Sequence, residues 1–361
     1  MKIAEVSPYS LSVPGGVQGQ VIALSHALSN LGHEVEIIAP YDEPVSAEEL
    51  RSLGASHTWR ANGSVAPIAI GPVMWRRMYR LLVGGTYDVV HVHEPFVPLV
   101  GVAAMLRSRA VTIGTFHRAG VSPIYRAYGR AFRPLTRRLD ASVAVSAEAA
   151  STAHEVWGLS PTVVGNAVDL SRFADARPWS HEGDVVMFIG RHEHRKGLST
   201  LLSAWRRIER LDTELWIAGD GPQTEELHHR FRGLDGVKWL GRISEAEASS
   251  RLRAADVVVA PSLYGESFGV VLLEAMAADA VVVASAIPGY QTVAQHERDA
   301  LLVPPGDDRS LADAIVRSLD DHTLASALRS GGRITAQGYS VDELAKSYAD
   351  LFLDCLSSRS K

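Results

Sequence analysis

A segment near residue 265 combines two carboxylates with a glycine-rich turn that leads into an apolar helix. Residues 261–277 read PSLYGESFGVVLLEAMA, with Glu266 before the expected helix and Glu274 eight positions later. The first N–H groups of a helix have no partner within the helix, so they can bind an anion. Carboxylates accept hydrogen bonds from hydroxyls. The segment therefore predicts a ligand that carries both phosphate and hydroxyl groups, as a nucleotide sugar does.

A second group of charged residues, GRHEHRKG at 190–197, follows a strand expected over 185–189. Parallel sheets bind ligands at the carboxyl ends of their strands, and cations at that edge match a diphosphate. Arg191 and Lys196 would also stabilise the charge that develops on a departing diphosphate. A solvated loop is the alternative for this segment alone. Together with residues 261–277, the loop favours a phosphate site.

Two features of the N-terminal half lie at expected strand ends. Gly15 and Gly16 follow the strand expected over 2–6, and they permit close approach of the backbone to a phosphate. His117 ends the strand expected over 111–116, where it could hydrogen-bond a sugar hydroxyl or stabilise a cationic centre. An ordinary tight turn and a structural histidine are the alternatives.

Two His-x-His pairs raise the question of a metal site. His91 and His93 lie on one face of an expected strand, with Glu94 adjacent. His192 and His194 form the second pair. Metal ligation needs further ligands, and neither pair has a clear third one nearby in the sequence. We therefore expect a metal-independent reaction that requires no cofactor.

Composition limits the class of protein. The chain has 361 residues, 46% hydrophobic and 21% charged, with a net charge of −5, which indicates a globular protein of two domains. A single cysteine, Cys355, argues against disulfides and cysteine-ligated zinc and fits a reducing cytosol. The N-terminus lacks the apolar run of a signal peptide, and no apolar run approaches the roughly 20 residues of a membrane span. We expect a cytoplasmic protein whose membrane contact is peripheral, on the inner face of the cell membrane.

Basic residues concentrate in the N-terminal half. Between Leu50 and Leu139 there are 13 basic and two acidic residues, a local charge of +11, which indicates an anionic partner or a solvated basic face. Residues 73–83 read VMWRRMYRLLV, with Trp75, Met78 and Leu82 on one helical face and three arginines on another, namely Arg76, Arg77 and Arg80. A helix at a membrane surface has this pattern, and so does a helix packed on its own sheet. A similar basic and aromatic stretch over 125–138 favours the anionic membrane surface.

Alternating strands and helices must position these residues. The hydrophobic pattern predicts a helix over 18–31 and strands over 2–6, 35–39, 88–93, 111–116 and 141–146. After an irregular connection over 169–183, helices are expected over 198–210, 224–231 and 244–254, between strands over 185–189, 214–218, 237–240, 257–260, 281–284 and 301–303. This predicts an α/β fold of two doubly wound, Rossmann-like parallel-sheet domains facing across a ligand-binding cleft. We expect the domains over 1–170 and 184–340, with a C-terminal helix over about 341–356 that packs back on the first domain.

Taken together, these segments resemble the family 4 retaining glycosyltransferases of the GT-B fold over nearly the whole chain. The resemblance is carried by PGGVQ at 14–18, DVVHVHEP at 88–95, TFH at 115–117, GNAVD at 165–169, GR at 190–191, RKG at 195–197, GDG at 219–221 and the segment 266–277. The opening residues 7–18 and NGSVA at 62–66 are most similar to the actinobacterial phosphatidylinositol mannosyltransferases.

For the donor, the resemblance implies a nucleotide-sugar site in the second domain. Arg191 and Lys196 would hold the diphosphate, helped by the backbone of Gly15 and Gly16. Glu274 would bind the ribose hydroxyls. Glu266 would bind the donor sugar together with the backbone of the next four residues, which are Ser267, Phe268, Gly269 and Val270.

For the acceptor, the resemblance implies a pocket in the first domain lined by Tyr9, Gln18, Asn62 and Ser64. His117 would contact the sugar near the reacting carbon, and with Arg191, Lys196 and Glu266 it would form the catalytic group. The acceptor hydroxyl would attack on the face from which the diphosphate leaves, and a leaving-group oxygen would take the proton. The anomeric configuration would be retained.

Two departures from the family pattern concern the substrate and the backbone. Pro67 stands where the mannosyltransferases have a basic residue placed for the inositol phosphate, which puts phosphatidylinositol itself in question. Asp279 stands where glycine is usual, and Asp tolerates left-handed geometry better than most residues. The expected reaction transfers a hexose, mannose from GDP-mannose or a sugar from a UDP donor, to an inositol-containing or other anionic lipid. The alternatives are a soluble acceptor, such as an inositol phosphate or a natural-product aglycone, and a GT-B nucleotide-sugar epimerase.

Overall fold

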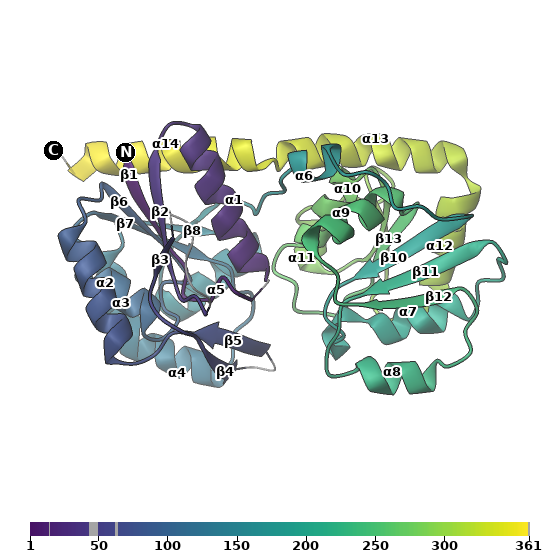
Figure 1. Ribbon diagram of the computed structural model, residues 1–361, viewed down its shortest axis with the longest axis horizontal. Helices are drawn as coiled ribbons and strands as arrows, with labels where there is room; N and C mark the ends of the chain where they lie inside the picture. The colour runs from purple at the N-terminus through teal and green to yellow at the C-terminus, as the bar shows by residue number, and fades with distance from the viewer. Residues whose placement is uncertain (14, 43–49, 62–63, 360–361) are drawn as a thin grey trace. The chain divides into compact units, whose positions relative to one another are not determined.

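Two parallel sheets, each covered by helices on both faces, organise the chain (Figure 1). The computed structural model describes residues 1–13, 15–42, 50–61 and 64–359. Unit 1 comprises Met1–Asn166 and Val341–Lys361, and unit 2 comprises Ala167–Ser340. The predicted fold of two Rossmann-like parallel-sheet domains is confirmed.

In the sheet of unit 1, the second and third strands of the chain lie on one side of the first strand, and the later strands lie on its other side. Its order is β3 (Leu50–Ser52), β2 (Glu34–Ala39), β1 (Lys2–Val6), β6 (Val89–His93), β7 (Val111–Phe116), β8 (Ala141–Ala144) and β9 (Thr162–Val163), all parallel. β6 and β7 are buried along their whole length, as strands covered on both faces must be. The strand order reverses between β1 and β6, where doubly wound sheets place their ligands.

Helices cover both faces of this sheet (Figure 1). On one face, α1 (Gly16–Asn30) and the C-terminal helix α14 (Val341–Arg359) pack with Leu24, Leu28, Tyr348 and Phe352 in the core. On the other face lie α2 (Pro72–Gly84) and α3 (Val100–Arg107). A third cluster is formed by α4 (Pro123–Phe132), the 3-10 helix η1 (Arg133–Arg138) and α5 (Ala147–Trp157). An antiparallel pair, β4 (His57–Ala61) and β5 (Ser64–Ile68), stands apart from the main sheet.

The sheet of unit 2 repeats the same design. Its order is β12 (Val237–Gly241), β11 (Thr213–Ala218), β10 (Asp184–Ile189), β13 (Val257–Ala260), β14 (Val281–Ser285) and β15 (Leu301–Val303). The order reverses between β10 and β13. One face packs against α7 (Leu198–Trp205), α8 (Thr224–Arg230) and α12 (Asp308–Asp320), and the other against α6 (Ser171–Ala174), α9 (Glu245–Ala254), α10 (Val270–Ala277) and α11 (Pro288–Gln291). The long helix α13 (His322–Gly338) contributes to both clusters.

The differences from the predicted elements have local causes. The strand predicted over 141–146 ends at Ala144, because Ser146 caps α5 by accepting a hydrogen bond from the Ala149 N–H. The helix predicted over 198–210 ends at Trp205, where the Ile208 N–H bonds to the Trp205 carbonyl and tightens the last turn. The short helix α6 lies inside the stretch that we expected to be irregular.

Asp279 has the left-handed geometry that its position in the sequence suggested. Its φ is 68°, and its carboxylate pairs with the Arg333 guanidinium at 2.8 Å. Among the described residues, no helix combines the length and the apolar character that crossing a membrane requires.

Candidate active site

Glycines bring the loops at the carboxyl ends of β10, β11 and β13 into direct contact. Gly197 follows the 3-10 helix η2 (His194–Lys196) with a φ of 68°, and a Cβ there would lie 1.9 Å from the Pro261 carbonyl oxygen. Gly219 has a φ of 115°, and a Cβ there would lie 2.0 Å from the Gly190 carbonyl oxygen. Only glycine fits either position, so the cationic loop after β10 is held against its neighbours by backbone contact.

One carboxylate oxygen collects most of the polar contacts at this edge. Glu266 Oε1 lies 2.7 Å from Lys196 Nζ and 2.8 Å from a terminal nitrogen of Arg195, and it accepts a hydrogen bond from Ser262 Oγ at 3.2 Å. Burial alone would raise the pKa of Glu266, but the charges of Lys196 and Arg195 hold it below its ordinary value. Glu266 and Lys196, which were predicted from separate segments, therefore form a single ion pair.

Glu193 links the remaining cations of this loop. Its two carboxylate oxygens lie 3.1 Å from Arg191 Nε and 2.9 Å from Arg195 Nε. The Arg191 side chain is 51% exposed, whereas that of Glu193 is largely buried. Sequence reasoning missed Glu193 and treated Arg195 only as part of a motif, although both lie in the charged loop after β10.

Glu274 occupies the second turn of α10 and is ion-paired. Burial raises its pKa, while Arg172 on α6, 3.1 Å away, opposes that shift. Arg172 Nε also donates to Ser249 Oγ at 2.9 Å, which fixes the guanidinium between α9 and α10. Sequence reasoning missed Arg172 because it lies in the segment expected to be a connection.

The segment from Ser267 to Val270 presents backbone, since its largest side chain points into the core. Phe268 is buried and packs edge-on against Tyr339 with ring centroids 5.5 Å apart. Gly269 caps α10 with a φ of 106°, and a Cβ there would meet the Tyr290 ring at 2.7 Å. This geometry leaves the N–H groups at the start of α10 available to an anion, beside the hydroxyl of the partly exposed Ser267.

In unit 1, His117 lies directly after β7 and belongs to a buried polar cluster. Its Nε2 lies 3.0 Å from His93 Nδ1, and His93 Nε2 lies 2.9 Å from Glu5 Oε2. His91 Nδ1 lies 2.8 Å from the same Glu5 oxygen. Burial lowers the pKa of His117 well below its ordinary value.

This cluster corrects one step of the sequence reasoning about metals. His91 and His93 do have a third group nearby, Glu5, and their ligand atoms lie within 4.8 Å of one another. Glu5 was missed because it comes from β1, where it is in register with His91 on β6. Each of these groups already has protein hydrogen-bond partners, with His91 Nε2 2.7 Å from Thr115 Oγ1. His192 and His194 do not face one another: His192 is buried with Nδ1 2.8 Å from Thr224 Oγ1, whereas His194 is exposed.

Glu94 holds the loop that carries His117. Its carboxylate accepts a hydrogen bond from the His117 N–H at 2.6 Å and another from the backbone of Arg118. Glu94 itself has a φ of 48°, an uncommon conformation for a residue with a side chain, and such strain is frequent at functional sites. Burial raises the pKa of Glu94. Sequence reasoning noted Glu94 only as a neighbour of the histidines.

The predicted acceptor residues that the structure describes lie near the end of β1. Burial, and then the charge of Glu94, raise the pKa of Tyr9, which places the phenol near that carboxylate. Gln18 is buried, with Nε2 3.5 Å from the Ser10 carbonyl. Asn62 lies outside the described residues, and of Ser64 only the backbone, in β5, is described. Tyr9, Glu94 and His117 therefore follow three adjacent strands of one sheet.

The two glycines at the start of α1 differ in their surroundings, because a Cβ at Gly15 would lie 2.5 Å from Gln18 Oε1 whereas Gly16 leaves open space. The helix begins at Gly16, and Gly15 has an extended φ of −174° that any residue adopts. A Cβ at Gly16 would meet nothing within 4 Å. The first turn of α1 is thus accessible to a ligand.

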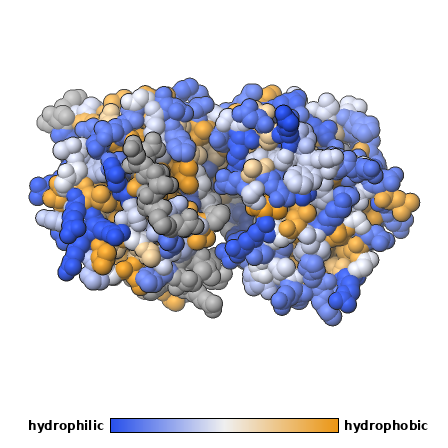
Figure 2. Space-filling view, viewed as in Figure 1, coloured by the Kyte–Doolittle hydropathy of each residue, from blue (hydrophilic) through white to orange (hydrophobic). Residues whose placement is uncertain are grey.

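The helix predicted to meet a membrane uses its apolar face inside unit 1. Met74, Met78 and Leu82 of α2 are buried against the sheet, and Trp75 is partly buried there. The opposite face is exposed and includes the three arginines of the prediction, Arg76, Arg77 and Arg80. In Figure 2, strongly hydrophilic side chains lie beside hydrophobic ones at the left edge, where Figure 1 places α2. Arg77 and Arg80 also line a hollow with Leu50, Arg51, Ser52 and Leu81.

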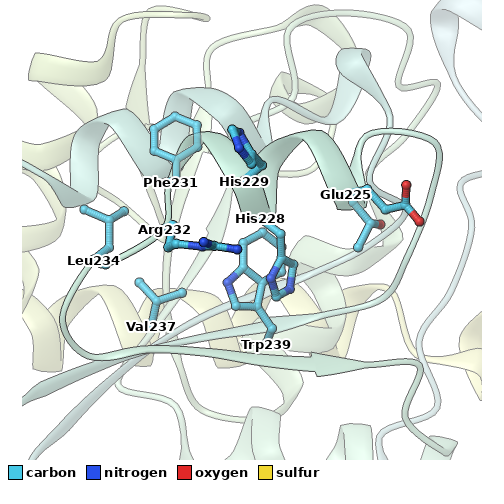
Figure 3. A pocket seen from close by; sticks show the side chains of 10 residues that line it. Glu225, His228, His229, Phe231, Arg232, Leu234, Val237 and Trp239 are labelled. Carbon is cyan, nitrogen blue, oxygen red and sulfur yellow. The ribbon is translucent and has the colours of Figure 1, made fainter.

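A larger hollow of about 500 Å³ lies between α8 and β12 in unit 2 (Figure 3). His228 packs on Trp239 with ring centroids 4.0 Å apart, and Arg232 and Glu225 also line the hollow. None of the predicted site residues lines this hollow.

The architecture and the site together define a glycosyltransferase of the GT-B fold. Residues 14–172 match the model of Glycosyltransferase Family 4, and residues 183–321 match that of Glycosyl transferases group 1. The phosphatidyl-myo-inositol mannosyltransferase of Mycolicibacterium smegmatis is 35% identical over 94% of this chain and 91% of its own length. The protein of the same name from Mycobacterium leprae is 33% identical over 100% and 99% of the two chains. The chain belongs to glycosyltransferase family 4.

Solved structures support the same fold. Sucrose-phosphate synthase from Thermosynechococcus elongatus superposes with a TM-score of 0.77 at 22% identity, covering 99% of both chains. HepE from Anabaena, solved in complex with UDP-glucose, superposes with a TM-score of 0.78 at 20% identity, covering 98% of this chain and 100% of its own. The resemblance to family 4 and the GT-B fold, both predicted from the sequence, are confirmed.

Proposed function

We propose that this glycosyltransferase transfers mannose from GDP-mannose, with retention of configuration, to an inositol-containing phospholipid at the cytoplasmic surface of a membrane. One observation carries the choice of sugar and acceptor. Relatives named phosphatidyl-myo-inositol mannosyltransferase align with nearly the whole of this chain and of themselves.

The donor half of the proposal rests on unit 2. Arg191 and Lys196 bind the diphosphate at the carboxyl end of β10, and Glu274 accepts hydrogen bonds from the ribose hydroxyls. Lys196 pairs with Glu266 in the structure. A bound diphosphate would give Lys196 a second anionic partner, which frees lone pairs of the Glu266 carboxylate for a sugar hydroxyl. The N–H groups at the start of α10 add further donors.

The chemistry follows from fixed positive charge. As the bond between the anomeric carbon and the diphosphate oxygen breaks, negative charge grows on that oxygen, and Arg191 and Lys196 stabilise it. The acceptor hydroxyl forms the new bond on the same face and passes its proton to the departing oxygen. His117 hydrogen-bonds a hydroxyl of the transferred sugar. These cations supply the stabilisation, so the proposed reaction requires no metal or cofactor.

The acceptor half rests on unit 1. Tyr9 and Gln18 line the proposed inositol pocket, and the exposed arginines of α2 contribute attraction to anionic lipid. Pro67, whose carbonyl accepts a hydrogen bond from the Ser10 N–H, replaces the cation that the resemblance leads us to expect. A soluble acceptor such as an inositol phosphate is therefore included in the test.

The test combines a donor panel with two acceptors and identifies products by mass spectrometry. GDP-mannose and several UDP-sugars are incubated with phosphatidylinositol vesicles or with free inositol phosphate. We expect a mannosylated lipid from GDP-mannose, with its anomeric configuration assigned by NMR. Glycosylation of inositol phosphate alone would replace the lipid acceptor, and sugar isomerisation without acceptor would indicate an epimerase.

A variant pair ties this activity to the proposed diphosphate site. Lys196→Gln should lower kcat/KM by roughly a hundredfold, as loss of one oriented charge contact in a transition state does. The exposed Lys238, which pairs with Glu214 at 2.5 Å in the same unit, provides the control Lys238→Gln. Equal activities of the two variants would remove Lys196 from the mechanism.

A further inference from the structure

A continuous chain of hydrogen bonds crosses the interior of unit 1 and ends at His117. Glu5, on the central strand β1, is wholly buried. Its Oε2 lies 2.8 Å from His91 Nδ1 and 2.9 Å from His93 Nε2, and both histidines belong to β6. His93 continues the chain to His117 through Nδ1, at 3.0 Å. On the other side, Thr115 Oγ1 connects His91 to the Tyr348 hydroxyl of α14, at 2.7 and 2.9 Å.

Glu5 is ionised within this chain. Burial alone would raise the pKa of its carboxyl, but the two histidines hold it at about 2. An ionised carboxylate only accepts hydrogen bonds, so His93 Nε2 must carry the proton that it donates to Glu5.

The position of the proton on His93 also determines the position of the proton on His117. Burial lowers the pKa of His93 to about 4 and that of His117 well below its ordinary value, so both rings are neutral at pH 7. A neutral imidazole has one N–H, so His93 Nδ1 is an acceptor, and His117 Nε2 must carry the proton in the bond between them. The lone pair of His117 is then on Nδ1. Among the described residues, none donates a hydrogen bond to that atom.

We propose that Glu5 is a positioning residue that, through His93, fixes His117 as the tautomer protonated on Nε2, so that Nδ1 accepts a hydrogen bond from a substrate hydroxyl. This role rests on the proposed function of His117 in glycosyl transfer. The wrong tautomer would place a donor where the hydroxyl proton must be accepted, and the hydrogen bond that Glu5 accepts from His93 Nε2 is what distinguishes the two states.

The hydrogen-bonding groups of this polar cluster have partners within the protein without a metal ion. Removing Glu5 would leave two buried imidazoles competing for partners, whereas with Glu5 present every bond has one donor and one acceptor. The position of Glu5 two strands away from β7 makes its action on His117 indirect.

The first test reads the tautomer directly. In protein labelled with 15N-histidine, long-range 1H–15N NMR spectra distinguish protonated from unprotonated ring nitrogens, and His117→Gln identifies the His117 signals. We expect Nε2 protonated in the wild type at neutral pH. An Nδ1-protonated His117 would overturn the proposal, whether or not the protein transfers mannose, so this outcome is separate from failure of the proposed function.

Variants of Glu5 then connect the tautomer to activity. Glu5→Met removes the acceptor, and we expect a mixture of His117 tautomers with kcat lowered roughly tenfold to a hundredfold. In Glu5→Gln a carbonyl can occupy the Oε2 position to which both imidazoles donate, so most activity should be retained. An unchanged His117 tautomer or unchanged kcat in a folded Glu5→Met variant would contradict the role of Glu5.

Tyr348→Phe is the matched control. It also deletes a buried hydrogen bond of the chain, at the end remote from His117. We expect wild-type kcat and an unchanged His117 tautomer in this variant. A loss of kcat equal to that of Glu5→Met would show that general disturbance of the core, rather than the path through His93, lowers activity.

Discussion

At the scale of single residues, the buried histidine His117 links the stability of unit 1 to pH. Its pKa is lowered by burial from the ordinary 6.5, so the unfolded chain binds a proton at a pH where the folded chain does not. The contribution of neutral His117 to the free energy of unfolding is therefore fully present above about pH 6.5. It declines as the pH falls, by at most about 1.4 kcal/mol per pH unit. We expect the free energy of unfolding in urea to decrease between pH 7 and pH 5, and His117→Gln to reduce that slope.

The control for this prediction is His229→Gln, because His229 is an exposed histidine in unit 2. It should leave the slope as in the wild type. A His117→Gln variant with an unreduced slope would mean that His117 is protonated in the folded protein, contrary to its burial beside His93.

The same scale shows which residues of the candidate site a sequence can indicate. Arg191, Lys196 and Glu266 could be predicted, because each lies in a loop directly after an apolar strand and parallel strands end at a common edge. Glu5 and Arg172 could not. Their partners are 86 and 102 positions away, and only strand register and helix packing bring them together. A lone Glu in a strand or an Arg in a connection has no local pattern that marks it.

At the scale of elements, the contact between the loops after β10 and β13 depends on Gly197. Alanine there would need a φ of 68° and would place its Cβ 1.9 Å from the Pro261 carbonyl oxygen, so backbone must move. We expect Gly197→Ala to lower the free energy of unfolding by at least about 2 kcal/mol and to weaken binding of GDP, the nucleotide of the proposed donor, because Lys196 moves with the loop. Urea unfolding and calorimetric titration with GDP measure both effects.

Gly241→Ala measures the cost of the left-handed backbone conformation without the steric clash that occurs at position 197. Gly241 has a similar φ of 65°, but a Cβ there would meet nothing within 4 Å. This variant should cost only the roughly 1 kcal/mol of a left-handed alanine and leave GDP binding unchanged. Equal costs at the two positions would show that the contact with Pro261 has no energetic importance.

The elements themselves were predictable to the extent that their hydrophobic pattern was strong. Except for the short edge strands β3 and β9, the strands of both sheets were found because they are mainly apolar runs, and β1, β7, β13 and β15 match their predicted bounds. The pair β4 and β5 was missed. The Asn62–Gly63 dipeptide between them is a typical hairpin signal, but it was interpreted only through its family resemblance.

At the scale of the whole molecule, charge is distributed unevenly over a chain of net charge −5. The stretch from Leu50 to Leu139 carries +11, and within it the exposed face of α2 carries three arginines. Most of the apolar face of α2 is occupied by the core of unit 1, with Val73 and Tyr79 exposed, so attraction to a membrane at this helix would be mainly electrostatic. This kind of binding must weaken as salt rises, because exposed charges are screened.

Replacing Arg76, Arg77 and Arg80 together with glutamine should therefore weaken binding to anionic vesicles. Each basic residue near an anionic surface contributes about 1 kcal/mol, so we expect a loss of at least roughly tenfold in vesicle affinity at low salt. Sedimentation with phosphatidylinositol-containing vesicles measures it, with neutral phosphatidylcholine vesicles as the reference. The control replaces three exposed arginines of unit 2, Arg230, Arg232 and Arg309, and changes the net charge by the same amount. If both triple variants lose affinity equally, attraction depends on total charge, and α2 has no special part in membrane contact.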